Sequence, residues 1–133
     1  MKIGITGSNS YQNYRKVKDT IFMLKQKFKE DLIIVSAGTL NGADKYAKKY
    51  AMELGCKYVE FNPAHTPKNL YSALHENYYG KKYNVKYFFH RNQMMAKYID
   101  YLIAFIPEGK KSSSSEHTIK ESKKLNKKIV IIS

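Results

Sequence analysis

The sequence predicts an α/β domain built on a doubly wound parallel sheet, because short apolar runs alternate with segments of helical periodicity. Residues 2–6 have the pattern of a short strand, and residues 32–35 form a continuous β-branched and aliphatic run, as expected of a strand covered on both sides. Between them, residues 17–28 place apolar side chains three or four positions apart, the spacing of one helix face. A strand, helix, strand succession with short connections is typical of right-handed crossovers between parallel strands.

A second helix is expected after the second strand. Its apolar stripe is narrow because alanines let a helix approach a sheet closely, and Gly55 marks its carboxyl end. The stripe consists of Leu40, Ala43, Ala47, Ala51 and Leu54.

The rest of the chain continues the alternation of strands and helices. We expect strands over residues 57–61, 100–106 and 128–132, and helices over residues 85–98 and 112–125. No internal repeat or linker divides the sequence, so we expect residues 1–133 to form one domain.

Residues 62–85 interrupt this pattern and are interpreted as a lid-like excursion. One Asn-Pro pair at 62–63 and one Thr-Pro pair at 66–67 break regular structure, although residues 68–79 could form a short helix. Four tyrosines crowd this segment, and they either stack on a bound base or form a satellite core or dimer contact. They are Tyr71, Tyr78, Tyr79 and Tyr83.

The composition argues for a folded protein of a reducing compartment. Apolar residues make up 43% and aromatic residues 14% of the chain, which argues against disorder. No apolar run approaches the roughly 18 to 20 residues of a membrane span. The single Cys56 cannot form an internal disulfide, so we expect a cytoplasmic protein without a membrane partner.

The formal net charge of +13 has two interpretations. A basic protein attracts phosphate and nucleic acid. Lysine together with abundant Asn, Tyr and Ile is also the mix expected from an AT-rich coding sequence, in which case the lysines only solvate the surface.

Three glycine- and serine-rich loops follow strands whose carboxyl ends should meet at one edge of the sheet. They are residues 7–10, 36–44 and 107–115. Each precedes a helix, and free N–H groups at a helix N-terminus favour an anion. A phosphate-bearing small molecule is therefore the expected ligand. The sequence lacks a P-loop and the Gly-x-Gly-x-x-Gly fingerprint, so neither a Walker-type NTPase nor a standard dinucleotide enzyme is expected.

Three segments in this order resemble the YspA/YpsA-related branch of the SLOG superfamily. They are "TGSNSYQNY" (6–14), "SAGTLNGADKYAKKYA" (36–51) and "RNQMMAKYIDYLIAF" (91–105). The resemblance implies a Rossmann-like sheet in the order 3-2-1-4-5 that binds nucleotides or nucleotide-derived ligands, and a homo-oligomer. More distant relatives are the Lonely-guy phosphoribohydrolases and DprA.

The resemblance also implies the ligand-binding residues. Arg91 would clamp a phosphate, because a planar guanidinium binds it in a bidentate way that lysine cannot imitate. Asp44 either accepts hydrogen bonds from ribose hydroxyls or only complements the helix dipole, and Met94 and Met95 are expected to fill the core. The expected ligand-binding set is Gly7, Ser8, Asn9, Gly38, Thr39, Gly42, Asp44, Arg91, Asn92, Ser112, Ser114 and Ser115.

A catalytic role is the weaker implication. The glutamate of the phosphoribohydrolase relatives corresponds to Thr118 here, with Glu116 and Glu121 nearby. Arg91 and Glu116 are therefore the candidate catalytic pair. The four histidines lack the spacing of a metal site, and we expect neither a metal nor a resident cofactor.

Three functions remain open from the sequence. The preferred one is binding of a nucleotide or nucleotide-derived phosphorylated molecule, in a sensing or sequestering role. The alternative is a nucleoside 5'-monophosphate phosphoribohydrolase. The third is a single-stranded nucleic-acid-binding module, in which lysines and tyrosines interleaved at residues 78–87 would contact phosphates and bases.

Overall fold

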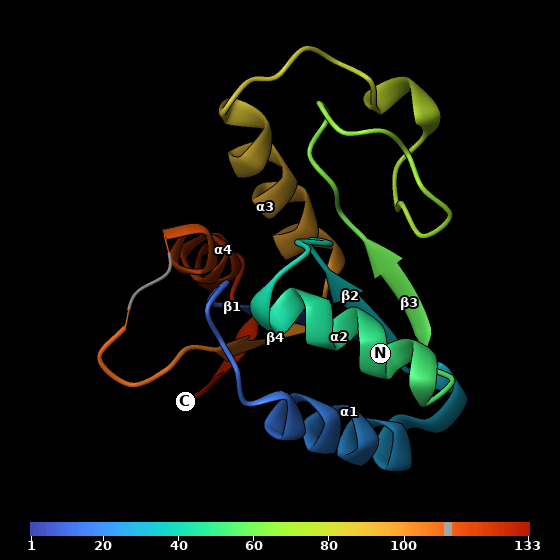
Figure 1. The fold of residues 1–133 in the computed structure, drawn as a ribbon, viewed down its shortest axis with the longest axis vertical. Helices are drawn as coiled ribbons and strands as arrows, with labels where there is room; N and C mark the ends of the chain where they lie inside the picture. Colours follow the sequence, from blue (N-terminus) through green and yellow to red (C-terminus); the bar gives the residue numbers. More distant parts are fainter. Residues whose placement is uncertain (111–112) are drawn as a thin grey trace.

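A computed structural model of the chain describes residues 1–110 and 113–133, and it contains the predicted parallel sheet. All strand pairs are parallel and their order is β3-β2-β1-β4-β5, which confirms the predicted fold class and order (Figure 1). The strands are β1 (Lys2–Gly7), β2 (Ile33–Ser36), β3 (Lys57–Glu60), β4 (Tyr101–Phe105) and β5 (Lys128–Ile132).

Helices cover both faces of this sheet. The α-helices are α1 (Tyr14–Phe28), α2 (Gly42–Glu53), α3 (Lys86–Tyr98) and α4 (Ser113–Lys124), and two short 3-10 turns are η1 (Lys29–Asp31) and η2 (Glu76–Tyr78). None of the described helices is long and apolar enough to cross a membrane.

Two apolar clusters form the core, one on each side of the sheet. Ile3 and Ile5 of β1 pack with α1 and α2, where Val17 and Ala47 are fully buried. The opposite cluster joins β4 to α3 and α4 through residues that include Leu102, Met95 and Ile119. Because successive strand residues point to opposite faces, β2 and β4 each supply side chains to both clusters.

Leu40 differs from its predicted place in the second helix. The helix begins at Gly42, after the N-cap residue Asn41, and the Leu40 side chain is 83% exposed. Gly42 has a φ of +64°, so the chain turns sharply between Leu40 and the first helical turn.

The possible helix over residues 68–79 is absent, and this segment contains η2 and an isolated parallel bridge between Ser72 and Glu60. Backbone hydrogen bonds with β3 replace the helical ones: Glu60 N–H donates to the Tyr71 carbonyl at 2.8 Å, and Ala73 N–H donates to the Glu60 carbonyl at 2.8 Å. Figure 1 shows residues 61–85 extending past the end of β3, beside the first turns of α3.

Candidate functional site

A cavity of about 340 Å³ lies at the carboxyl ends of the strands, and we name it the first chamber. Its volume lies within the range of small-molecule sites in proteins. The loops after β1 and β2 form one side, and α3 and the start of α4 form the other. Its lining residues are Thr6, Gly7, Asn9, Ala37, Thr39, Asp44, Val85, Phe88, Phe89, Arg91, Asn92, Ser114 and Ser115.

Arg91 projects from α3 into the wall of this chamber and is only 4% exposed. Its Nε donates to Oδ1 of Asn92 at 2.8 Å, and a terminal nitrogen donates to the Ala37 carbonyl at 3.3 Å. Among the described residues, no carboxylate oxygen lies within 4 Å of the guanidinium. A buried cation without an ion-pair partner is costly, and an anion in the chamber would compensate it.

Asn92 connects Arg91 to α4. Its Nδ2 lies 3.4 Å from the Ser114 carbonyl and 3.2 Å from Nδ1 of His117. The other ring nitrogen of His117 lies 3.3 Å from a carboxylate oxygen of Glu121. A chain of polar contacts therefore runs from the surface of α4 to the buried guanidinium.

Asp44 lies in the first turn of α2 and is 6% exposed. Thr39 N–H donates to its Oδ2 at 3.4 Å, whereas its Oδ1 has no hydrogen-bond partner in the part of the chain that the structure describes. Burial raises the pKa of this carboxyl from 3.8 to about 6, although the Thr39 hydrogen bond and the charge of Arg91 oppose the rise.

Hydroxyl groups and two helix N-termini complete the first chamber. Thr6 and Ser115 contact each other through their side-chain oxygens at 3.1 Å, which joins the end of β1 to α4. Both α2 and α4 begin at this edge of the sheet, so their positive dipole ends face the same region. Hydroxyls, N–H groups and a guanidinium are the groups that bind phosphate in proteins.

Comparison with known proteins identifies the family. The model of the YspA, cpYpsA-related SLOG family matches residues 1–66. The chain belongs to the SLOG superfamily. No curated protein sequence matches this SLOG protein.

Two solved structures share the fold of this SLOG protein at low sequence identity. The molybdenum cofactor binding protein from the phototrophic bacterium Rippkaea orientalis has a TM-score of 0.70 and 13% identity, over 98% of this chain and 74% of that one. The molybdenum cofactor carrier protein MCP from Chlamydomonas reinhardtii has a TM-score of 0.64 and 17% identity, over the same shares of the two chains. At such identities the likeness establishes the fold alone.

The first chamber brings together residues from all three loops that the sequence singled out, and residues of α3. Those of the expected ligand-binding set that line it are Gly7, Asn9, Thr39, Asp44, Arg91, Asn92, Ser114 and Ser115. Segments that are distant in the chain therefore meet at one edge of the sheet.

The remaining predicted residues lie elsewhere. Ser8 is buried beneath the loop, with its Oγ 2.8 Å from Oγ of Ser10, and Gly38 lines a neighbouring cavity. Gly42 packs against the backbone of Ser8. Glu116 is exposed and lines a separate surface hollow on α4, and Ser112 lies outside the described residues.

Sequence reasoning missed several residues of the chamber wall: Thr6, Ala37, Val85, Phe88 and Phe89. The spacing of Phe88 and Arg91, three positions apart on one helix, could have indicated that they share a face. Among the described residues, no group of three or more His, Cys, Asp or Glu side chains is arranged to hold a metal ion.

Proposed function

We propose that this SLOG protein binds a nucleotide or nucleotide-derived phosphorylated molecule in the first chamber, in a sensing or sequestering role. The single observation that carries the proposal is the buried guanidinium of Arg91, which faces a ligand-sized cavity without a carboxylate within 4 Å among the described residues. A phosphate would form a direct ion pair with the guanidinium, which Asp44 does not form, and would accept two parallel hydrogen bonds.

Other features support a small anionic guest. Thr39 and Ser114 offer hydroxyls, and Phe88 and Phe89 offer flat apolar surface for a ring. The two structures of similar fold are named for binding and carrying the molybdenum cofactor, which supports a small-molecule site in this fold without specifying a nucleotide.

Binding is favoured over turnover because the expected catalytic carboxylate is not in the chamber. Glu116 lines the hollow that Lys120 and Lys123 also line, whereas Asp44 is the one carboxylate among the described residues of the first chamber. A glycosidase needs a charged or proton-transferring group beside the sugar, and Asp44 would have to perform that role alone.

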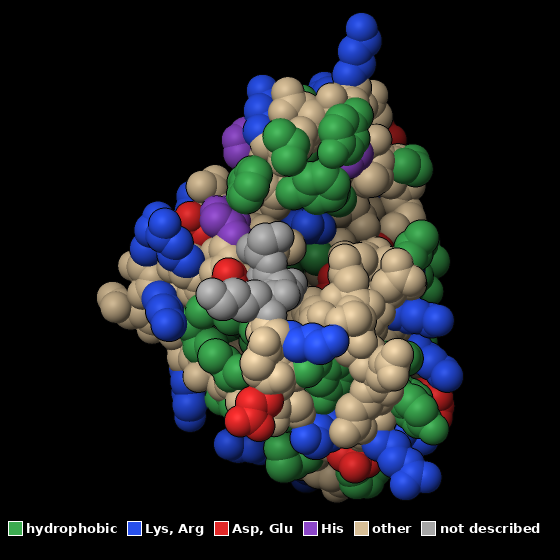
Figure 2. All heavy atoms as spheres, turned by 60° about the vertical axis from the view of Figure 1, so that its left-hand side comes forward, with side chains coloured by type: hydrophobic (Ala, Val, Ile, Leu, Met, Phe, Trp, Pro, Cys, Tyr) green, Lys and Arg blue, Asp and Glu red, His purple; other side chains and the backbone are tan. Residues whose placement is uncertain are grey.

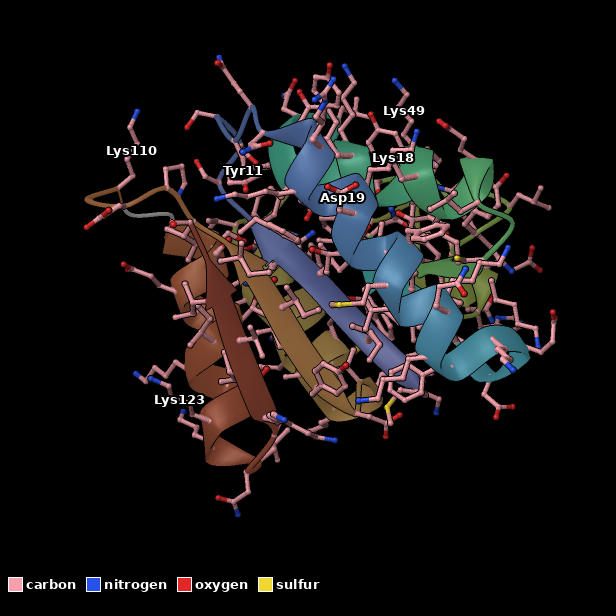
Figure 3. The ribbon with its side chains drawn as sticks, turned by 90° about the horizontal axis from the view of Figure 1, so that it is seen from below. Tyr11, Lys18, Asp19, Lys49, Lys110 and Lys123 are labelled. Atoms are coloured by element: carbon pink, nitrogen blue, oxygen red, sulfur yellow. The ribbon has the colours of Figure 1, made fainter. Side chains whose placement is uncertain are left out.

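Nucleic-acid binding is less favoured because the basic side chains are dispersed. Lys and Arg side chains are spread over the face shown in Figure 2 rather than gathered in one stripe. In Figure 3, the labelled lysines lie apart from one another: Lys18 is on α1, Lys49 on α2, Lys110 in the loop after β4 and Lys123 on α4. A nucleic-acid site usually concentrates such charges along one groove.

The two arginines of the chain provide a matched test. We expect AMP to bind the wild type in isothermal titration calorimetry and to raise its melting temperature. Arg91→Ala should weaken binding by about 100-fold, the effect of losing a charge-assisted phosphate contact, and Arg91→Lys should restore part of it. Arg15→Ala, an exposed change on α1, should leave binding unchanged. Equal affinities in Arg91→Ala and wild type would refute the proposal.

The enzymatic alternative is tested in the same samples. Chromatography after long incubation with AMP would reveal adenine and ribose 5-phosphate if the chain were a phosphoribohydrolase. Release of equal trace amounts by wild type and Arg91→Ala would exclude this activity. Mass spectrometry of the molecule retained after purification would identify the natural ligand, including a molybdenum cofactor.

A further inference from the structure

A second cavity of about 530 Å³ adjoins the first chamber, and we name it the second chamber. It lies between the loop after β2, residues 62–69 and α3. Four residues line both chambers: Ala37, Thr39, Phe88 and Arg91. Arg91 and Phe88, with the guanidinium carbon 5.6 Å from the ring centre, therefore form the boundary at which the two chambers meet.

The second chamber differs from the first in its chemistry. Among its described lining residues there is no carboxylate and no lysine, so Arg91 at the boundary supplies its one permanent charge. Asn62, Asn69 and His65 contribute polar groups, and Leu40, Phe88 and two prolines contribute apolar surface. Carboxamides beside flat apolar surface suit an uncharged ring with hydrogen-bonding edges.

Buried and partly buried hydrogen bonds hold the two carboxamides in place before any ligand arrives. The Nδ2 atoms of Asn62 and Asn69 donate to Oε2 of Glu60 at 3.0 and 2.8 Å. Ser72 Oγ donates to Oδ1 of Asn62 at 2.8 Å, and Lys48 Nζ lies 2.8 Å from Oε1 of Glu60. Side chains that are already ordered lose little entropy when a ligand binds.

We infer that the ligand has two arms, with its anionic centre beside Arg91, one arm in the first chamber and an uncharged ring in the second. A phosphoanhydride or phosphodiester that joins two groups fits this arrangement, because its phosphate lies between the arms as Arg91 lies between the chambers. This inference rests on the proposed function and narrows its ligand class.

Calorimetry with two matched probes tests the second arm. ADP carries a pyrophosphate and one adenosine, and diadenosine diphosphate carries the same pyrophosphate between two adenosines. The second probe has less negative charge, so tighter binding cannot come from charge. We expect diadenosine diphosphate to bind at least about tenfold more tightly than ADP, as extra contacts of roughly 1.4 kcal/mol would produce.

Two exposed leucines supply the variant and its control. Leu40 is 83% exposed and lines the second chamber, whereas Leu70 is 89% exposed and lines neither chamber. Leu40→Ala should reduce the preference for diadenosine diphosphate over ADP by about fivefold through lost apolar contact, and Leu70→Ala should leave it unchanged. Both substitutions are at the surface, so both proteins should fold.

The outcomes separate this inference from the proposed function. Equal affinity of the wild type for the two probes, or a preference that Leu40→Ala leaves intact, would overturn the two-armed ligand. If ADP still bound in an Arg91-dependent way, the proposed function would stand. Failure of both probes to bind at millimolar concentration would overturn both.

Discussion

Nε of Arg91 donates a 2.8 Å hydrogen bond to Oδ1 of Asn92, its neighbour on α3, and both side chains are buried. This bond sets the orientation of the carboxamide, whose Nδ2 then lies toward Ser114 and His117 on α4. The direction of the guanidinium in the chamber thus depends on the packing of α3 against α4.

Asn92→Ala should weaken ligand binding while leaving the Arg91 side chain in place. The substitution leaves the buried Nε of Arg91 without an acceptor, which costs about 1 to 3 kcal/mol. We expect AMP affinity to fall about tenfold and the melting temperature to fall as well. The exposed neighbour change Gln93→Ala is the control and should alter neither quantity. Unchanged AMP affinity in Asn92→Ala would show that the carboxamide does not position Arg91.

Asp44 should make the free protein less stable as pH rises. Its carboxyl has a pKa of about 6 in the folded chain against an ordinary 3.8, so the folded state binds more protons between these values. Stability therefore falls as pH rises from about 3.8 to about 6, by about 3 kcal/mol in total, and stays at the lower level above that range.

Asp44→Asn removes this titration and keeps an oxygen for Thr39 N–H. Urea unfolding should find the variant about as stable as wild type near pH 4 and up to about 3 kcal/mol more stable above pH 6. A difference in stability between Asp44→Asn and wild type that does not change with pH would contradict the raised pKa of Asp44. The unpartnered Oδ1 supports the same expectation, because a buried unpaired acceptor is costly when charged.

The sequence predicted the sheet and the meeting of its loops because both follow from local patterns. Continuous apolar runs identify buried strands, and parallel strands bring their carboxyl ends to one edge. Arg91 could be singled out because lysine dominates the basic residues of this chain. An arginine is rare in such a composition, which indicates that its position requires a guanidinium.

Contacts between distant segments could not be predicted in the same way. Glu60 looks like an ordinary polar strand residue, yet its side chain is 1% exposed because Lys48 on α2 and Asn69 in the excursion reach it. Leu40 continued the apolar stripe in sequence, but the turn at Gly42 separates it from the helix. Periodicity describes one element and says nothing about such partners.

Gly42→Ala should destabilise the fold strongly and disturb the first chamber. A Cβ there would lie 2.1 Å from the Ser8 carbonyl oxygen and 2.7 Å from Cα of Asn9, at a φ of +64°. We expect a loss of about 3 kcal/mol or more in the free energy of unfolding, because backbone atoms must move and the conformation itself is strained.

Gly109→Ala is the matched control for that change. Gly109 has a φ of +75°, and a Cβ there would meet no heavy atom within 4 Å. Its substitution should cost only the conformational strain, about 1 kcal/mol, and leave AMP binding intact. Equal losses at Gly42 and Gly109 in urea unfolding would show that the loop after β1 does not press on the start of α2.

Glu60→Gln should destabilise the protein because Glu60 accepts the hydrogen bonds that hold Asn62 and Asn69 in the second chamber. The carboxylate accepts hydrogen bonds from Tyr58 at 3.0 Å, from Asn62 and Asn69, and from Lys48. Burial alone would raise the pKa of this carboxyl, but the hydrogen bonds of Lys48, Asn62 and Asn69 outweigh burial and lower it. A glutamine would turn an N–H toward these donors, at a cost of about 3 kcal/mol near pH 7.

The pH dependence of that loss has the opposite sign to the one expected for Asp44. Because the folded pKa of Glu60 lies below its ordinary 4.5, the ionised carboxylate stabilises the fold above that value. The difference between wild type and Glu60→Gln should therefore shrink as pH falls below about 4.5. Glu53→Gln breaks the exposed pair with Lys18 and should cost less than about 0.5 kcal/mol, since solvent screens it. Equal effects at Glu60 and Glu53 would mean that burial does not strengthen the Glu60 contacts.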